Sequence, residues 1–138
     1  EQSELEPNGD DFMATILLIE DNAGSRDLYS FYLQNEGYKV VQASDGNQGL
    51  EIISSEDVDL VLTDIFMPER DGYETIQTLR NENRQIPVIA ISGKEEKYKF
   101  SLQVASILGA DLVLRKSVDK KDLLAAIQSL LPEGAKSN

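Results

Sequence analysis

The sequence contains no cysteine, no histidine and no tryptophan. Without cysteine there can be no disulfide, no thiolate nucleophile and no cysteine zinc site, and the reducing cytoplasm is the expected location. Without histidine there can be no serine–histidine–aspartate triad, no histidine base and no histidine metal ligand. Any chemistry must therefore use carboxylates, lysine, hydroxyls, backbone groups and, where needed, a hard metal ion.

Positive charge and long apolar runs are also scarce. The chain has 13 Lys and Arg against 25 Asp and Glu, so its formal net charge is −12. A field of this sign repels phosphate backbones and anionic lipids, so we expect no direct binding to nucleic acid or to a membrane. No apolar run approaches the length of a membrane span, and the acidic first residues do not resemble a signal peptide.

The 138 residues suffice for one domain with a single hydrophobic core. Residues 1–12 carry five acids and no basic residue, which is typical of a disordered leader or a vector-derived remnant, with Met13 as the original start. We expect the folded domain at 13–131 and a tail at 132–138.

Apolar runs typical of buried strands alternate with apolar residues at helical spacing. The expected strands cover 16–19, 39–43, 60–63, 87–91 and 112–114. The apolar residues that mark the expected helices are Leu28, Phe31, Tyr32; Leu50, Ile53; Tyr73, Ile76, Leu79; Phe100, Val104, Ile107, Leu108; and Leu123, Ile127, Leu130, Leu131. We expect the helical aromatics in the core. This alternation predicts an α/β fold of flavodoxin-like type, a (βα)5 three-layer sandwich with a parallel sheet of order 2-1-3-4-5.

Polar residues follow the expected strands at their carboxyl ends. Glu20 and Asp21 follow the first strand, Asp64 the third, Ser92 the fourth and Lys116 the fifth. The first and third strands are neighbours in the predicted order, so the three carboxylates should converge, with the serine and the lysine on the far side. Clustered carboxylates repel one another unless a cation neutralises them, and oxygen ligands suit Mg²⁺ or Mn²⁺. Such a set could bind a phosphoryl group, with Asp64 as the nucleophile.

These motifs resemble the receiver domain of two-component response regulators, in particular its chemotaxis-regulator-like members. The resemblance covers about 14–131. It rests on Glu20-Asp21, the run DIFMPERDG at 64–72, Ser92-Gly93, Gly109-Ala110-Asp111 and Lys116. It implies a phosphorelay switch that catalyses only its own phosphorylation and dephosphorylation, and that changes conformation for a partner to detect.

The resemblance also implies a role for each matching residue. Asp64 would be the phosphoacceptor, and Mg²⁺, with Mn²⁺ as a substitute, would bind Asp21, Asp64 and the backbone carbonyl of Phe66. Glu20 would act largely through a bound water. The phosphoryl donor would be the phosphohistidine of a histidine kinase or a histidine phosphotransfer protein. A downstream output domain or protein would read the switch, and the chain would be a monomer or a weak phosphorylation-dependent dimer.

On the phosphoryl side, Ser92 would donate a hydrogen bond and Lys116 would pair with an oxygen. Two neighbouring residues depart from the family pattern. Ser117 stands where the family usually has proline after a cis bond, and a cis bond before serine costs about 2.5–4 kcal/mol. We therefore expect either a trans bond with a reshaped loop or a strained cis bond. Val113 stands where the family often has a mobile Tyr or Phe, so the signal should pass mainly through 92–99 and the fourth helix.

Other interpretations of single residues stay open. Asp21 or Asn22 could cap the first helix. Asp71 and Glu74 have the spacing of a capping box, so we assign Asp71 to the start of the third helix rather than to the site.

Two other functions also stay open. One is a metal-dependent phosphatase of haloacid-dehalogenase type, although such enzymes usually need a second acid where this chain has Phe66. The other is an interaction module of the same fold that works without phosphorylation, which Ser117 and Val113 keep open.

Overall fold

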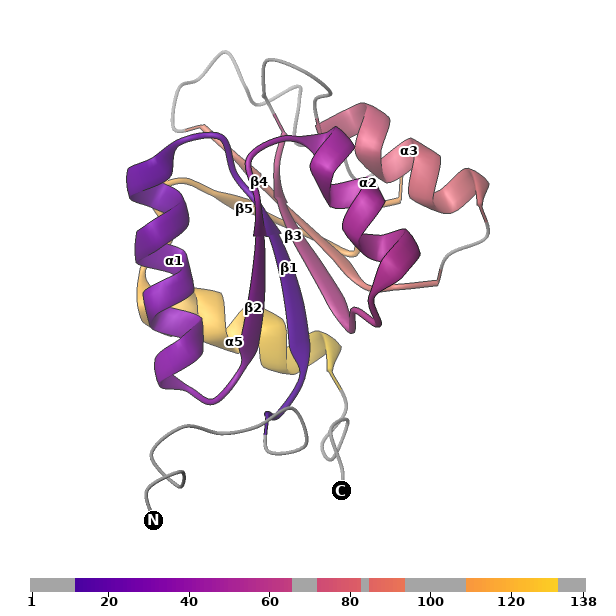
Figure 1. The fold of residues 1–138 in the computed structure, drawn as a ribbon. Coiled ribbons are helices and arrows are strands. Elements are labelled where there is room, and N and C mark those ends of the chain that lie inside the picture. Colours follow the sequence, from indigo (N-terminus) through magenta and orange to yellow (C-terminus); the bar gives the residue numbers. More distant parts are fainter. Residues whose placement is uncertain (1–11, 66–71, 83–84, 94–108, 132–138) are drawn as a thin grey trace.

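Five parallel strands form a sheet in the order β2-β1-β3-β4-β5 (Figure 1). They are β1 (Thr15–Ile19), β2 (Lys39–Ala43), β3 (Leu60–Asp64), β4 (Val88–Ser92) and β5 (Leu112–Arg115). The computed structural model describes residues 12–65, 72–82, 85–93 and 109–131. The strand order and the parallel direction confirm the predicted flavodoxin-like α/β fold.

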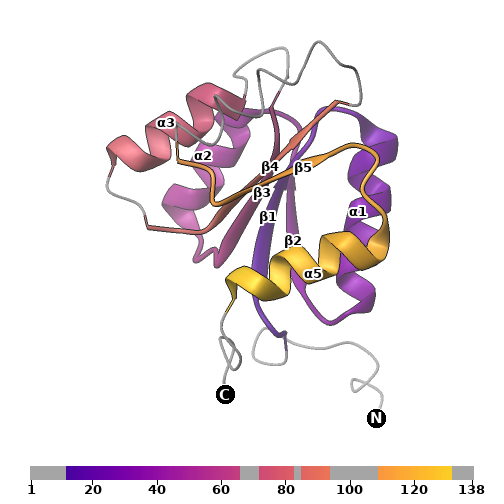
Figure 2. The same cartoon turned by 180° about the vertical axis from the view of Figure 1, so that it is seen from behind.

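Helices cover both faces of the sheet. They are α1 (Ala23–Asn35), α2 (Gly46–Ser55), α3 (Gly72–Asn81) and α5 (Lys120–Leu130). Figures 1 and 2 show α1 and α5 together on one face, and α2 and α3 on the other. The helix predicted around 100–108 and the tail at 132–138 lie outside the described residues, as does the predicted leader up to residue 11. Among the described residues, no helix combines the length and apolarity that a membrane crossing requires.

Alternation along the strands divides the core into two clusters. In β1, Ile16 and Leu18 join the cluster under α1 and α5, while Leu17 and Ile19 join the cluster under α2 and α3. Because both faces are buried, the strand reads as a continuous apolar run rather than an alternating one. The same alternation determines toward which face a residue after the strand points.

Local hydrogen bonds close α1 and begin α2. Gly37 has φ +99°, and the N–H groups of Gly37 and Tyr38 donate to the carbonyls of Gln34 and Leu33, which closes α1. The Asp45 side chain accepts from the Gln48 N–H at 2.9 Å and begins α2. Both helix boundaries are thus set by groups that lie within a few residues of the helix end.

The predicted core face of α1 is partly wrong. Leu28 and Phe31 are 47% and 58% exposed, whereas Tyr29 and Leu33 are buried. Residues 28 and 31 share one helical face, and 29 and 33 share another, so spacing alone fits both. The face with Tyr29 and Leu33 packs against the sheet, and Phe31 lies outside the core.

Candidate functional site

Strand register brings two acids of the candidate site together. The pairing of β1 with β3 aligns Ile19 with Thr63, so Glu20 and Asp64 follow at the next step. The Glu20 N–H donates to the Ala43 carbonyl at 3.0 Å, which extends the ladder past the end of β1. Glu20 and Asp64 are 1% and 6% exposed. Two carboxylates are therefore buried side by side at the carboxyl edge of the sheet.

The register of β4 and β5 brings the remaining candidates to the same edge. Ser92 pairs with Arg115, and the N–H of Lys116 donates to the Ser92 carbonyl at 2.7 Å. Ser92 is fully buried, and within the described part of the chain its hydroxyl is the one buried side-chain group without a hydrogen-bond partner. The structure thus places Ser92 at the edge but outside the contact network of the acids.

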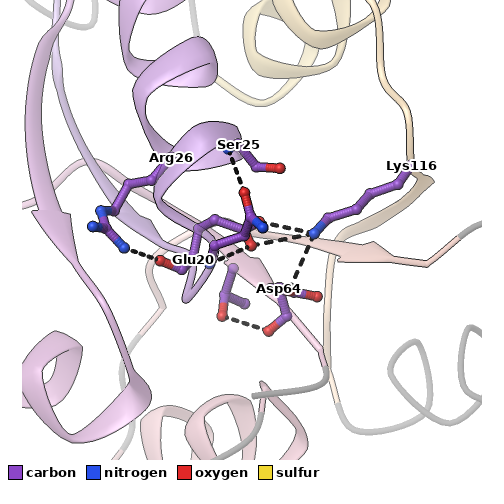
Figure 3. A network of polar contacts seen from close by, with 7 residues as sticks. Glu20, Ser25, Arg26, Asp64 and Lys116 are labelled. Atoms are coloured by element: carbon purple, nitrogen blue, oxygen red, sulfur yellow. Dashed lines mark hydrogen bonds and ion pairs between the residues drawn. The ribbon is translucent and has the colours of Figure 1, made fainter. Parts of the chain in front are cut away.

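Lys116 joins the acids across the sheet, as Figure 3 shows. Its Nζ lies 3.2 Å from both carboxylate oxygens of Glu20 and 3.3 Å from Oδ2 of Asp64. One carboxylate oxygen each of Glu20, Asp21 and Asp64 lie within 4.8 Å of one another. One ammonium thus contacts two carboxylates with a third beside them, which leaves an excess of negative charge.

This charge excess shifts the protonation of the cluster. Burial is the largest cause that raises the pKa of Glu20 to about 7, and the charge of Asp64 adds to it. Lys116 and the Asn22 N–H oppose this shift without cancelling it. For Lys116, burial lowers the pKa, but the charges of Asp64 and Glu20 outweigh burial and raise it overall. Near neutral pH the cluster therefore attracts a proton or a cation.

The donor set fits Mg²⁺. Opposite oxygens around one Mg²⁺ ion lie about 4.2 Å apart, close to the spread of the three carboxylates here. Asn22, rather than Asp21, caps α1 by accepting the Ser25 N–H at 2.8 Å, so the exposed Asp21 carboxylate has no capping role. The Phe66 carbonyl, predicted as a further ligand, lies outside the described residues, and so does Asp71.

The structure describes both residues that depart from the family pattern, Ser117 and Val113. The Lys116–Ser117 peptide bond is cis, so the trans bond with a reshaped loop is not found. Val113 is partly buried and packs against the cluster under α2 and α3.

Several groups around the site were not predicted from the sequence. Thr63 Oγ1 donates to the Asp64 carbonyl at 2.9 Å, and Arg26 donates to the Glu20 carbonyl at 2.7 Å. Tyr29 is buried near Lys116, and burial raises the pKa of its hydroxyl. One signal could have indicated Arg26, because a cation near a helix N-terminus opposes the helix dipole.

The sheet order, the acidic cluster and the lysine at the carboxyl edge together define a domain of receiver type. The family model for the response regulator receiver domain matches residues 16–128. The chain therefore belongs to the response regulator receiver domain family, whose members act in two-component phosphorelay signalling.

Curated relatives agree with this assignment. The chain is similar to the response regulator SaeR of Staphylococcus epidermidis, with 30% identity over 126 residues, 91% of this chain and 54% of SaeR. SaeR of Staphylococcus aureus is 29% identical over 119 residues, 86% of this chain and 51% of SaeR. The chain thus spans about half the length of the curated relatives it matches.

Solved structures agree as well. A CheY-like receiver domain of Methanospirillum hungatei has a TM-score of 0.80 and 28% identity, with 91% of this chain and 99% of that chain covered. The response regulator TrrA of Thermotoga maritima, solved in complex with Mg²⁺-BeF, has a TM-score of 0.76 and 30% identity, with 86% and 100% covered. These neighbours confirm the CheY-like fold.

Proposed function

We propose that this domain accepts a phosphoryl group on Asp64, with Mg²⁺ bound, and that phosphorylation shifts it between two conformations. The observation that carries the proposal is the surroundings of Asp64. Its carboxylate is buried at the end of β3, 3.3 Å from the Lys116 ammonium and beside the carboxylates of Glu20 and Asp21. A buried acid with a cationic neighbour and a cation-binding cluster has the parts that phosphoryl transfer needs.

In the proposed transfer, one Asp64 oxygen attacks the phosphorus of a partner's phosphohistidine. The new O–P bond forms as the P–N bond breaks, and the bond electrons leave with the imidazole. The donor histidine belongs to a histidine kinase or a phosphotransfer protein, because this chain has no histidine. Hydrolysis reverses the state, as water attacks the phosphorus and releases phosphate and the Asp64 carboxylate.

The other residues bind and orient the phosphoryl group. Asp21 and Asp64, with Glu20 largely through a bound water, would hold Mg²⁺, which would neutralise phosphoryl charge. Lys116, already in contact with Asp64, pairs with a phosphoryl oxygen. Ser92 donates to another oxygen, and its buried, unpartnered hydroxyl supports this role within the described residues. The proposed conformational change begins when Lys116 and Ser92 form these new contacts with the phosphoryl group.

The proposal extends to the Phe66 carbonyl as a further ligand and to signal passage through 92–99 and the fourth helix. It also includes a downstream partner, a weak phosphorylation-dependent dimer and a cytoplasmic location. Family membership favours a phosphoacceptor switch over the metal-dependent phosphatase. Phosphorylation of Asp64 is the property that distinguishes this switch from an interaction module that works without phosphorylation.

The test is incubation with Mg²⁺ and acetyl phosphate or phosphoramidate, followed by intact mass measurement. We expect the mass of one labile phosphoryl group on the unaltered chain and on Asp57→Asn, which changes an exposed acid before β3. Asp64→Asn should carry none. No adduct with any donor contradicts the proposal and favours the phosphorylation-independent module. Steady hydrolysis of unrelated phosphomonoesters would favour the phosphatase instead.

A further inference from the structure

The turn between β1 and α1 carries two acids of the proposed metal site and is held by its own hydrogen bonds. The Asn22 N–H donates to Oε2 of Glu20 at 3.1 Å, and the Asn22 side chain accepts from Ser25. Arg26 Nη1 donates to the backbone carbonyl of Glu20 at 2.7 Å (Figure 3). The side chain and the backbone of Glu20 are thus fixed by different partners.

Arg26 contacts the site through the backbone rather than through charge pairing. Among the described residues it forms no ion pair with an acid. A charge-assisted hydrogen bond to a carbonyl is short and directional, so it fixes the plane of the Glu20–Asp21 peptide. That peptide links the buried acid to the exposed one.

The position of Arg26 is unfavourable for the helix itself. It is the fourth residue of α1, and the first turn of this helix contains no acid. A cation near the N-terminus opposes the helix dipole. Helix stability therefore does not account for an arginine here, whereas the contact with the Glu20 carbonyl does.

We propose that Arg26 is a positioning residue for the cation site, because its hydrogen bond to the Glu20 carbonyl fixes the turn that orients Glu20 and Asp21. This role rests on the proposed function, since it concerns the proposed Mg²⁺ site. A positioning role and a purely electrostatic role predict opposite changes in Mg²⁺ affinity when Arg26 is removed. Loss of a positive charge near a cation site strengthens cation binding by electrostatics alone, whereas loss of positioning weakens it.

The test is calorimetric titration of Mg²⁺ into the unaltered chain and three variants at one ionic strength. R26Q removes the guanidinium and its charge, and R26K keeps the charge on a shorter stem. Lys39→Gln is the matched control, because it removes one positive charge from the exposed start of β2. Thermal melts by circular dichroism establish that each variant is folded. Arg26→Met, which keeps the apolar stem, replaces R26Q if R26Q does not fold.

We expect R26Q to bind Mg²⁺ about tenfold more weakly than the unaltered chain. R26K should recover part of this loss, and Lys39→Gln should bind at least as tightly as the unaltered chain. An R26Q affinity equal to or above that of the unaltered chain overturns the role of Arg26 and leaves the proposed site intact. Absence of Mg²⁺ binding by the unaltered chain overturns the proposed site, and the role of Arg26 with it.

Discussion

Charged side chains have different partners at the two edges of the sheet, where the parallel strands begin and where they end. At the amino edge, Arg80 of α3 donates to the Gly109 carbonyl at 2.8 Å, to the Ile86 carbonyl at 2.9 Å and to Asp111 Oδ2 at 3.1 Å. Asp111 also accepts the Val88 N–H at 2.8 Å. Arg80 and Asp111 form an ion pair at this edge, and their contacts join α3 to the starts of β4 and β5.

At the carboxyl edge, carboxylates outnumber the lysine that contacts them. Lys116 contacts Glu20 and Asp64, a third acid lies beside them, and the pKa of Glu20 is raised to about 7. Ser92 is buried there without a partner among the described residues. Polar groups at the amino edge complete the fold, whereas those at the carboxyl edge are placed to bind a ligand. Mg²⁺ should therefore affect variants at the carboxyl edge and leave those at the amino edge unchanged.

The largest expected effect is that of Lys116→Met. This change removes the ammonium that contacts both buried carboxylates and should lower the metal-free unfolding free energy by about 3 kcal/mol. Saturating Mg²⁺ should recover part of this loss, because a divalent cation replaces the missing charge. Urea denaturation with and without Mg²⁺ measures both. A loss that Mg²⁺ leaves unchanged would contradict a cation site at this edge.

A smaller effect is expected for Arg80→Ala. Loss of the guanidinium leaves Asp111 and two carbonyls with fewer partners, which should cost about 2 kcal/mol of unfolding free energy. The cost should be the same with and without Mg²⁺, because this edge is distant from the acids. Lys121→Ala, at an exposed position of α5, serves as the control and should change stability by less than about 0.5 kcal/mol. An Mg²⁺-dependent cost for Arg80→Ala would abolish the contrast between the edges.

The pH dependence of Glu20 is the least direct of the three effects, because its proton is shared within a coupled cluster. In metal-free protein the folded pKa is raised from 4.5 to about 7, so the folded state binds this proton more tightly than the unfolded state. The stability from Glu20 is full below pH 4.5 and is lost as pH rises to about 7. Thermal melts in chelator should show this loss in the unaltered chain relative to Glu20→Gln. Parallel pH profiles for the two proteins would contradict the raised pKa.

Much of the fold could be predicted from local sequence patterns. Apolar runs locate the strands, and Gly37 and Asp45 mark a helix end and a helix start through backbone chemistry that acts within a few residues. Acids placed directly after β1 and β3 predict a shared edge, because parallel strands end together. The convergence of Glu20, Asp21 and Asp64 follows from this topology.

Contacts that depend on packing could not be predicted in this way. Phe31 and Leu33 are both apolar residues of α1, and only the docking of the helix decides that Leu33 is buried and Phe31 exposed. Arg26 and Arg80 donate to backbone carbonyls, and no sequence motif identifies which carbonyl accepts each bond. The bond between Arg80 and Gly109 joins residues that are 29 positions apart. Side-chain placement across the fold sets these contacts, and spacing along the chain does not encode it.

The most direct measurement is the location of the phosphoryl group on the chain. Borohydride reduces an acyl phosphate to an alcohol, so treatment after phosphorylation, followed by peptide mass spectrometry, marks the modified side chain. Residue 64 should be converted to homoserine only in samples that contained Mg²⁺ and a phosphoryl donor. A mark on another residue, or an adduct that resists borohydride, would contradict Asp64 as the phosphoacceptor.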